Sequence, residues 1–345
     1  MSATDPPVDE AALEERLSRP TPALVAEIAG LEGDLVVLGA GGKMGPTLAV
    51  MARRALTAAG RDDVEVIAVS RWSDRAAAAR VRALGVRTQV MDLGVDTELS
   101  ALPDAAAVVY LIGAKFGSSA QPHVAWTTNA VLPALLARRY PAARIVALST
   151  GNVYPLVPVD GPGADETSPL GPVGEYAMSC VGRERAFEAA SALRGTATAL
   201  IRLNYAVELR YGVLTDLAER VRSRIPIALD TSHANVVWAG YVNEVVLRIL
   251  GRVSSPPTVL NVTGVPAVSV RAVADRLGEL LGIEPSYVGA PAPTALLSDA
   301  RRCVELFGAP EVDEWTLLRW QADWFAAGHP VWAKATKFER RDGKF

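Results

Sequence analysis

Residues 35–45 read Leu35-Val36-Val37-Leu38-Gly39-Ala40-Gly41-Gly42-Lys43-Met44-Gly45, an apolar run followed at once by a glycine-rich turn. An uninterrupted apolar run of this length is typical of a parallel strand that is covered on both faces. The glycines repeat at GxxGxxG spacing, and Pro46 then opens a helical pattern that continues to Ala59. The order of strand, glycine turn and helix therefore decides how this part of the chain is interpreted.

A turn of this kind brings backbone N–H groups and a helix N-terminus to one point, where they can hold a pyrophosphate. A Cβ atom in the turn would keep the phosphates away, which is the reason that glycine is needed. The pattern predicts a dinucleotide site, with a purely structural turn as the alternative reading. The residues assigned to the cofactor here are Gly39, Gly42, Lys43, Met44 and Gly45.

Strand and helix patterns alternate along the next part of the chain. Strands are expected at 64–69, 86–90, 106–112, 144–148 and 198–203, and helices at 74–84, 131–139 and 268–281. This rhythm predicts an α/β fold, a Rossmann doubly wound parallel sheet with a smaller C-terminal substrate or lid domain. The expected boundaries are an N-terminal helical extension at 1–33, a dinucleotide-binding domain at 34–203 that also receives strands from 234–263, and a smaller domain at 204–233 and 264–345.

Composition excludes several classes of protein. The chain has 345 residues, 21% of them charged, with a formal net charge of -3. Without a basic stripe or a long apolar run, neither nucleic acid nor a membrane is expected as a partner. The acidic N-terminus lacks the features of a secretory signal, so the cytoplasm is the expected compartment. The two cysteines, Cys180 and Cys303, are far apart and predict reduced thiols and no metal site.

The end of the second strand bears on the choice of cofactor, because an acid there binds a ribose hydroxyl and a base accommodates a 2′-phosphate. The residues at this point are Ser70 and Arg71, which favour NADP over NAD. A solvated arginine is the alternative. Asp92 and Leu93 close the third strand, where an adenine ring would be held, and Asp92 could equally cap a helix.

Further motifs follow the later strands in a characteristic order. They are Gly113-Ala114-Lys115, Asn129, Ser149-Thr150-Gly151-Asn152-Val153-Tyr154, Gly174-Glu175-Tyr176, Ile201-Arg202-Leu203-Asn204 and Gly308-Ala309-Pro310. Together with the glycine turn and Asp92-Leu93, they resemble the extended short-chain dehydrogenase/reductase family, the NAD(P)-dependent epimerase/dehydratase group. The similarity spans residues 34–326 and implies cofactor contacts at Gly113, Lys115 and Asn129.

The resemblance also implies a catalytic group with one member missing. Thr150 matches the family residue that binds the substrate oxygen, and Tyr176 matches the tyrosine that moves its proton. Where the family has a lysine four residues later, this chain has Cys180. A phenol with a pKa near 10 is a poor base unless a cation stabilises its anion, so standard hydride chemistry is expected to be slow or absent.

Two residues at this site, Lys115 and Cys180, each allow two interpretations. Lys115 lies in a segment similar to a stretch of UDP-galactose epimerases whose lysine approaches the cofactor, so that it would partly compensate for the missing charge. A solvated loop lysine is the equal alternative. Cys180 is either a reactive thiol or a small buried side chain, and the second reading is favoured.

The sequence contains fewer motifs that indicate the substrate than motifs that indicate the cofactor. Trp238-Ala239-Gly240-Tyr241 stands where the family has an HVxD segment, and Arg210, His233 and Asn235 are the nearby polar candidates. We expect a small carbohydrate-like substrate and do not assume a nucleotide-sugar, and a homodimer stays open. The leading reading is an NAD(P)-dependent oxidoreductase or epimerase-like enzyme. Its rivals are a catalytically weakened dinucleotide-binding sensor or regulator, and an enzyme that keeps its cofactor permanently bound.

Overall fold

The central feature of the computed structural model, which describes residues 5–94, 97–334 and 336–345, is one seven-stranded sheet. Every neighbouring pair in it is parallel. In spatial order the strands are β12 (Thr258–Val262), β7 (Thr198–Leu203), β5 (Arg144–Thr150), β4 (Ala107–Tyr110), β1 (Leu35–Leu38), β2 (Val66–Ser70) and β3 (Arg87–Val90). The predicted Rossmann fold is confirmed.

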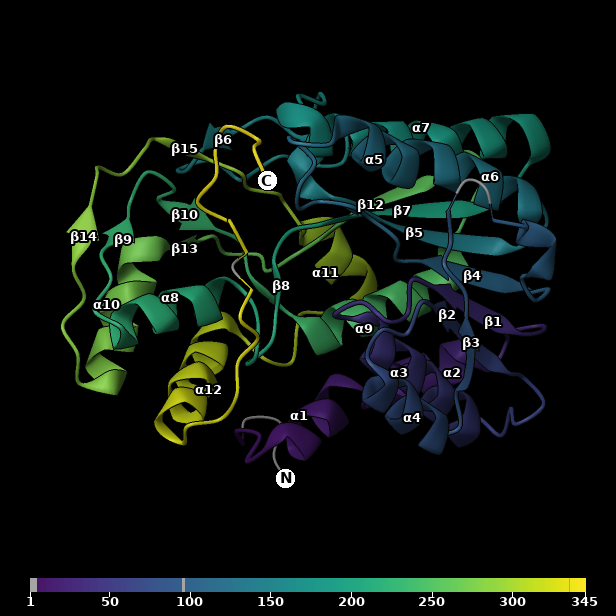
Figure 1. The fold of residues 1–345 in the computed structure, drawn as a ribbon, viewed down its shortest axis with the longest axis horizontal. Coiled ribbons are helices and arrows are strands. Elements are labelled where there is room, and N and C mark those ends of the chain that lie inside the picture. The colour runs from purple at the N-terminus through teal and green to yellow at the C-terminus, as the bar shows by residue number, and fades with distance from the viewer. Residues whose placement is uncertain (1–4, 95–96, 335) are drawn as a thin grey trace.

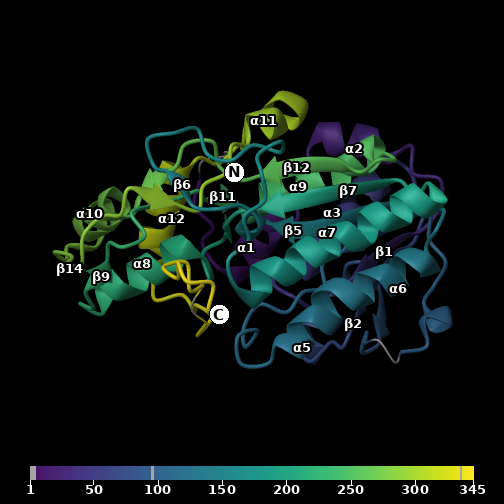
Figure 2. The same cartoon turned by 90° about the horizontal axis from the view of Figure 1, so that it is seen from above.

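Alternate residues of each strand enter two different cores, which explains the uninterrupted apolar runs. Val36 and Leu38 face one layer, and Leu35 and Val37 face the other. The first layer holds α5 (Pro122–Trp126), α6 (Leu132–Arg139) and α7 (Gly174–Arg194). The second holds α3 (Gly45–Ala58), α4 (Arg75–Ala83) and α9 (Ala239–Arg248). Figure 1 shows these layers above and below the sheet, and Figure 2 shows the first layer from outside.

Two short helices precede the sheet. They are α1 (Glu10–Leu17) and α2 (Pro22–Ile28), capped by the side chains of Asp9 and Thr21. Leu13, Leu17 and Leu24 are buried in the same core as α3 and α9. The N-terminal extension is thus packed against the dinucleotide-binding half; its residues 1–4 lie outside the described part of the chain.

The second lobe combines helices with two-stranded ladders. Its helices are α8 (Val213–Arg222), α10 (Val270–Leu281) and α12 (Glu314–Ala326), while α11 (Arg301–Phe307) packs on β12. The ladders pair β9 (Ile227–Ala228) with β14 (Tyr287–Val288), β10 (His233–Ala234) with β13 (Val268–Ser269), β6 (Val157–Pro158) with β15 (Thr294–Ala295), and β8 (Ala206–Val207) with β11 (Val237–Trp238).

One predicted helix begins later than expected. The apolar pattern suggests a start at Val268, but Val268 and Ser269 pair with β10 and α10 begins at Val270. The Ser269 side chain accepts a hydrogen bond from the Ala272 N–H and caps the helix. A capping serine therefore marks the boundary more accurately than the apolar pattern does.

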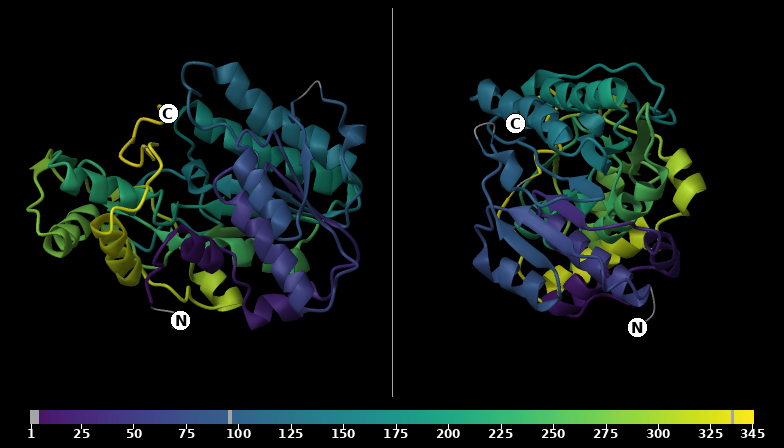
Figure 3. Two further views of the ribbon diagram at one scale, coloured as in Figure 1. Left: turned by 60° about the horizontal axis from the view of Figure 1, so that its bottom comes forward. Right: turned by 90° about the vertical axis from the view of Figure 1, so that its right-hand side faces the viewer.

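The C-terminal segment returns from α12 toward the sheet. Figure 1 shows this yellow segment between the two lobes, and the left view of Figure 3 shows it ending near α7. Gly343 lies directly against Val173 and Gly174 at the start of α7. We call described residues 330–334 and 336–345 the C-terminal strap.

Candidate functional site

Three glycines have different structural roles in the turn between β1 and α3. Gly39 has φ +83°, and a Cβ there would lie 2.9 Å from the Ile112 side chain, so the close approach to β4 requires glycine. A Cβ on Gly45 would overlap the backbone of Ala40. Gly42 is different, because a Cβ there would meet only the Gly39 carbonyl, at 3.3 Å. The turn thus presents an open face at Gly42, as a cradle for a pyrophosphate requires.

A cavity of about 380 Å³ opens from this turn across the carboxyl ends of the strands. Such an edge is where doubly wound sheets bind their ligands. Nine of the residues predicted for the site line the cavity: Gly39, Gly42, Lys43, Met44, Gly45, Gly113, Lys115, Thr150 and Tyr176. Six do not line it: Ser70, Arg71, Asp92, Leu93, Asn129 and Cys180.

Tyr176 and Thr150 come together at one end of the cavity. Thr150 ends β5, and Tyr176 is in the first turn of α7. Burial raises the pKa of the Tyr176 phenol, while a hydrogen bond from the Thr150 hydroxyl lowers it. The phenol of Tyr176 donates to the Cys180 thiol one helical turn away, a bond that holds the proton on the phenol.

Cys180 is a fully buried thiol. It is 0% exposed and packs with Val153, Tyr154 and Ala164 in a small apolar cluster. Burial raises the pKa of its thiol, which disfavours the reactive thiolate. Its surroundings are those of a small core side chain.

A buried cation that the sequence motifs did not single out lies on the same helix. Arg183 is only 4% exposed, and its guanidinium donates to the Leu148 carbonyl and to the Asn129 side chain, both at 2.7 Å. Asn129 in turn bonds both backbone groups of Ala114. The helical spacing of Arg183, seven residues after Tyr176, was the available signal. Asn129 thus ties the loop after β4 to α7 and lies behind the cavity wall.

The end of β2 lies beside the turn but outside the cavity. A Cβ on Gly41 would be 2.6 Å from the Ser70 hydroxyl, so Ser70 faces the glycine turn directly. Arg71 and Asp92 are both exposed and their charged groups are 3.8 Å apart. Leu93 packs against the core of the first layer, the one under α6 and α7. These positions are close enough together to form the adenosine end of one site.

Two lysines enter the cavity from the dinucleotide-binding half. The Lys43 ammonium lies 2.8 Å from the centre of the Tyr211 ring, a cation–π contact. Burial, followed by the charges of Lys334 and Lys115, lowers the pKa of Lys43 to about 7. Lys115 donates to the Thr336 carbonyl at 3.4 Å, and burial lowers its pKa to about 8. Lys115 is therefore partly buried in the site and is not a solvated loop residue.

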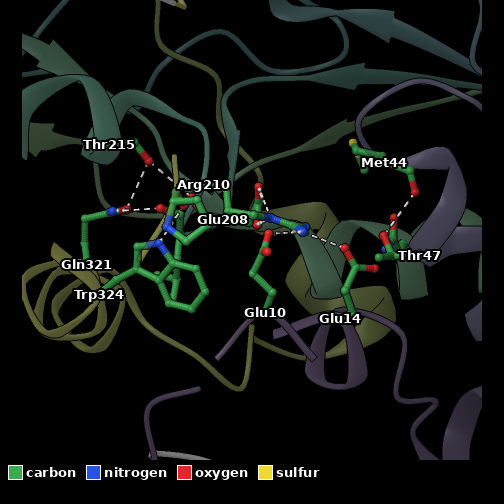
Figure 4. A network of polar contacts seen from close by, with 12 residues as sticks. Glu10, Glu14, Met44, Thr47, Glu208, Arg210, Thr215, Gln321 and Trp324 are labelled. Carbon is green, nitrogen blue, oxygen red and sulfur yellow. Dashed lines mark hydrogen bonds and ion pairs between the residues drawn. The ribbon is translucent and has the colours of Figure 1, made fainter. Parts of the chain in front are cut away.

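The polar candidates for substrate recognition have other partners. Arg210 donates to Glu208 at 3.0 Å and to Glu14 of α1 at 2.6 Å, as Figure 4 shows. Asn235 bonds the Gly264 carbonyl and the Ser298 N–H. His233 lines a separate pocket of about 10 Å³. None of the three lines the main cavity.

The second lobe supplies cavity residues that sequence reasoning did not single out. They are Tyr205, Glu208, Tyr211, Trp332 and Thr336. Glu208 is 8% exposed, and burial raises its pKa to about 7 against the opposing effect of Arg210. No local motif marks these residues, because they reach the site from distant parts of the chain. Within the described residues, no group of three or more metal-binding side chains forms, and no helix has the length and hydrophobicity needed to cross a membrane.

Solved structures of similar fold share this architecture over 85% of the chain. The UDP-Glc/GlcNAc 4-epimerase from Campylobacter jejuni has a TM-score of 0.69 at 21% identity, over 85% of this chain and 98% of that one. The dTDP-glucose 4,6-dehydratase DesIV from Streptomyces venezuelae, solved with NAD, has a TM-score of 0.69 at 20% identity, over 85% and 97%. The UDP-glucuronic acid 4-epimerase from Bacillus cereus, also solved with NAD, has a TM-score of 0.70 at 16% identity, over 85% and 98%.

Sequence identities of this size show a shared fold. The chemistry of this chain has to be inferred from the residues of its own site. No curated protein matches the chain in sequence. The sequence model of one family, described as the NAD dependent epimerase/dehydratase family, matches residues 35–236, which is more than half of the chain. On that match and the shared fold, the chain belongs to the NAD dependent epimerase/dehydratase family.

Proposed function

We propose that the chain is an NAD(P)-dependent oxidoreductase or epimerase/dehydratase-like enzyme, acting on a hydroxyl or carbonyl of a carbohydrate-like small molecule. One observation carries the proposal. A single cavity reaches from the glycine turn at Gly42 to the phenol of Tyr176 and the hydroxyl of Thr150. A dinucleotide on the turn and a substrate at the phenol would therefore meet inside it.

Each residue of the polar pair has a distinct task in this proposal. A bound nicotinamide would supply the acceptor or donor of hydride. Thr150 holds the substrate oxygen and donates to the Tyr176 phenol, and Tyr176 takes or returns the proton of that oxygen. Lys115, whose ammonium is 5.8 Å from the centre of the Tyr176 ring, provides positive charge that the missing lysine would have provided.

We further propose that NADP is preferred to NAD. Ser70 faces the glycine turn and Arg71 stands exposed beside it, so a 2′-phosphate at this point would find a hydroxyl and a guanidinium. The proximity of Asp92 to Arg71 opposes the preference by partly neutralising that charge. Comparison of the two dissociation constants by calorimetry tests the preference. A cytoplasmic location remains part of the proposal.

A second candidate function is a catalytically weakened dinucleotide-binding sensor. The observation that favours it is the raised pKa of the Tyr176 phenol. The hydrogen bond to Cys180 keeps the proton on the phenol, whereas a lysine at position 180 would stabilise the phenolate. In that case the cavity would bind the dinucleotide and change the contacts of the C-terminal strap without turnover.

Replacement of Tyr176 by Phe separates the two candidates. We expect turnover of carbohydrate-like substrates, followed by both the near-ultraviolet signal of reduced nicotinamide and the appearance of epimerised or dehydrated product, to fall at least about a hundredfold, because general acid–base catalysis contributes that much. Cofactor affinity should stay within about twofold. The matched control is Tyr287→Phe, which removes an exposed phenol bonded to Asp275 far from the cavity. An enzyme whose activity survives Tyr176→Phe would contradict the proposal, and a native protein that binds dinucleotide without turnover would favour the sensor.

A further inference from the structure

The C-terminal strap closes one side of the cavity. Trp332 and Thr336 line it, and the strap is held by bonds from the Trp332 N–H to the Arg210 carbonyl and from Thr336 to the Asp216 carboxylate. Near the end of the strap, the Gly117 N–H donates to the Phe345 carbonyl, and the Phe345 ring meets the Tyr176 ring edge to face. The strap is thus fastened to both lobes.

Four ammonium groups converge where the strap meets the dinucleotide-binding half. They surround the Phe116 ring, at 4.8 Å for Lys334, 5.6 Å for Lys337, 5.8 Å for Lys115 and 6.0 Å for Lys43. Two come from the strap, one from the loop after β4 and one from the glycine turn. Lys337 holds an uncommon left-handed backbone, φ +56°, at this point.

Among the described residues, no carboxylate lies within ion-pair distance of these four ammonium groups. In the ion pairs of the described residues the cations are arginines, and none of the four lysines takes part. The acids whose charges reach Lys43 and Lys115 have other partners: Asp216 bonds Thr336, Glu208 bonds Arg210, and Glu339 lies 4.0 Å from Arg220. Like charges gathered without a counter-ion are unfavourable, so the arrangement points to a ligand that supplies negative charge.

We propose that Lys334 and Lys337 of the strap, with Lys43 and Lys115, bind a phosphoryl group of the substrate. A carboxylate brings one negative charge, whereas a phosphoryl group brings two and three acceptor oxygens, which suits several ammonium donors better. The inference rests on the proposed function, since Lys43 and Lys115 of the cluster line the cavity assigned to the substrate. Half of the cluster lies on the strap and not on the glycine turn, and this favours the substrate over the cofactor pyrophosphate as the source of the phosphate.

Inorganic phosphate is the probe for a calorimetric test on the full chain. The double variant Lys334→Gln/Lys337→Gln should weaken phosphate binding at least about tenfold, because each lost bond to a charged group costs a measurable factor. The matched control is Arg340→Gln/Lys344→Gln, which removes two charges from the same strap at exposed positions outside the cluster. It should change phosphate affinity by less than about twofold. Thermal unfolding establishes that both variants are folded.

Titration of the same proteins with NADP(H) and NAD(H) separates the two sources of phosphate. We expect dinucleotide affinity to be unchanged in both double variants. Equal phosphate binding in the native and Lys334→Gln/Lys337→Gln proteins would overturn the inference. An equal loss of phosphate and dinucleotide binding would assign the cluster to the cofactor and also overturn it. A native protein that binds phosphate but no dinucleotide would instead contradict the proposed function.

Discussion

Cys180 and Arg183 together determine the charge behind Tyr176. The family lysine would bring an ammonium to position 180, but here that position is an uncharged thiol and the cation stands three residues later. Charge interaction with Arg183 lowers the pKa of the Tyr176 phenol, although burial outweighs it. Arg183 therefore provides, from behind the cavity wall, part of the positive field that the lysine would provide from within.

This arrangement predicts that a lysine at position 180 is harmful. Cys180→Lys would place an ammonium in a fully buried position near a buried guanidinium, so we expect a loss of about 3 kcal/mol in the free energy of unfolding. Cys180→Ser is the control for the loss of the thiol and should cost about 1 kcal/mol. Both values come from denaturant titration.

A double-mutant cycle gives the reason for that loss. If repulsion between the two cations is responsible, Arg183→Met should restore part of the stability of Cys180→Lys. A Cys180→Lys protein as stable as the native one, with faster turnover, would contradict this account and identify the site as a standard one with a missing part.

At the scale of elements, the sheet was predictable and the second lobe was not. The sheet strands β1, β2, β4, β5 and β7 are largely apolar runs of four to seven residues separated by helices, so a local pattern indicates them; the edge strand β3 is partly exposed. Ladders such as β9 with β14 have two residues per strand, which is too short for any periodicity. The half of the cavity that follows β1, β4 and β5 was therefore foreseen.

The other half of the cavity depends on long-range contacts. Tyr211, Trp332 and Thr336 come from the loop before α8 and from the strap, and nothing near them in the sequence indicates that they line one cavity with Lys43. The same holds for the link between α1 and the cavity, in which Arg210 bonds Glu14 across the interface shown in Figure 4.

The glycine turn allows a test in which folding and binding are separable. A Cβ on Gly42 would stand 3.3 Å from the Gly39 carbonyl, a tight contact that a small shift relieves, and Gly42 does not have a positive φ; Gly42→Val should therefore fold with a stability loss of no more than about 1 kcal/mol. Its side chain would occupy the space of the pyrophosphate, so dinucleotide affinity should fall at least about a hundredfold. Gly251→Val, where a Cβ meets nothing within 4 Å, is the matched control. Unchanged affinity in folded Gly42→Val would remove the assignment of the turn to the cofactor.

At the scale of the whole molecule, the strap places its own lysines beside those of the dinucleotide-binding half. Lys43 and Lys115 belong to the dinucleotide-binding half, and they face Lys334 and Lys337 of the strap. The other titratable groups that face them are Glu208, Tyr211, Asp216, Glu339 and, next to Lys115, Cys180. The free energy of unfolding should therefore depend on pH through the titration of Lys43 and Lys115.

The direction of this pH dependence follows from proton linkage. Burial lowers the pKa of Lys43 to about 7 and of Lys115 to about 8 in the folded chain, while both are near 10.5 when unfolded. Between these values the unfolded chain binds more protons, so the free energy of unfolding rises with pH. From about pH 7 to about pH 9 we expect a gain of roughly 1 kcal/mol, discounted for partial solvent exposure. The double variant Lys43→Met/Lys115→Met should flatten the slope, and Lys344→Gln should not. Saturating inorganic phosphate should also flatten it, because a bound anion returns the two lysines to their protonated state; a slope that persists in the double variant would mean that other groups control the pH dependence.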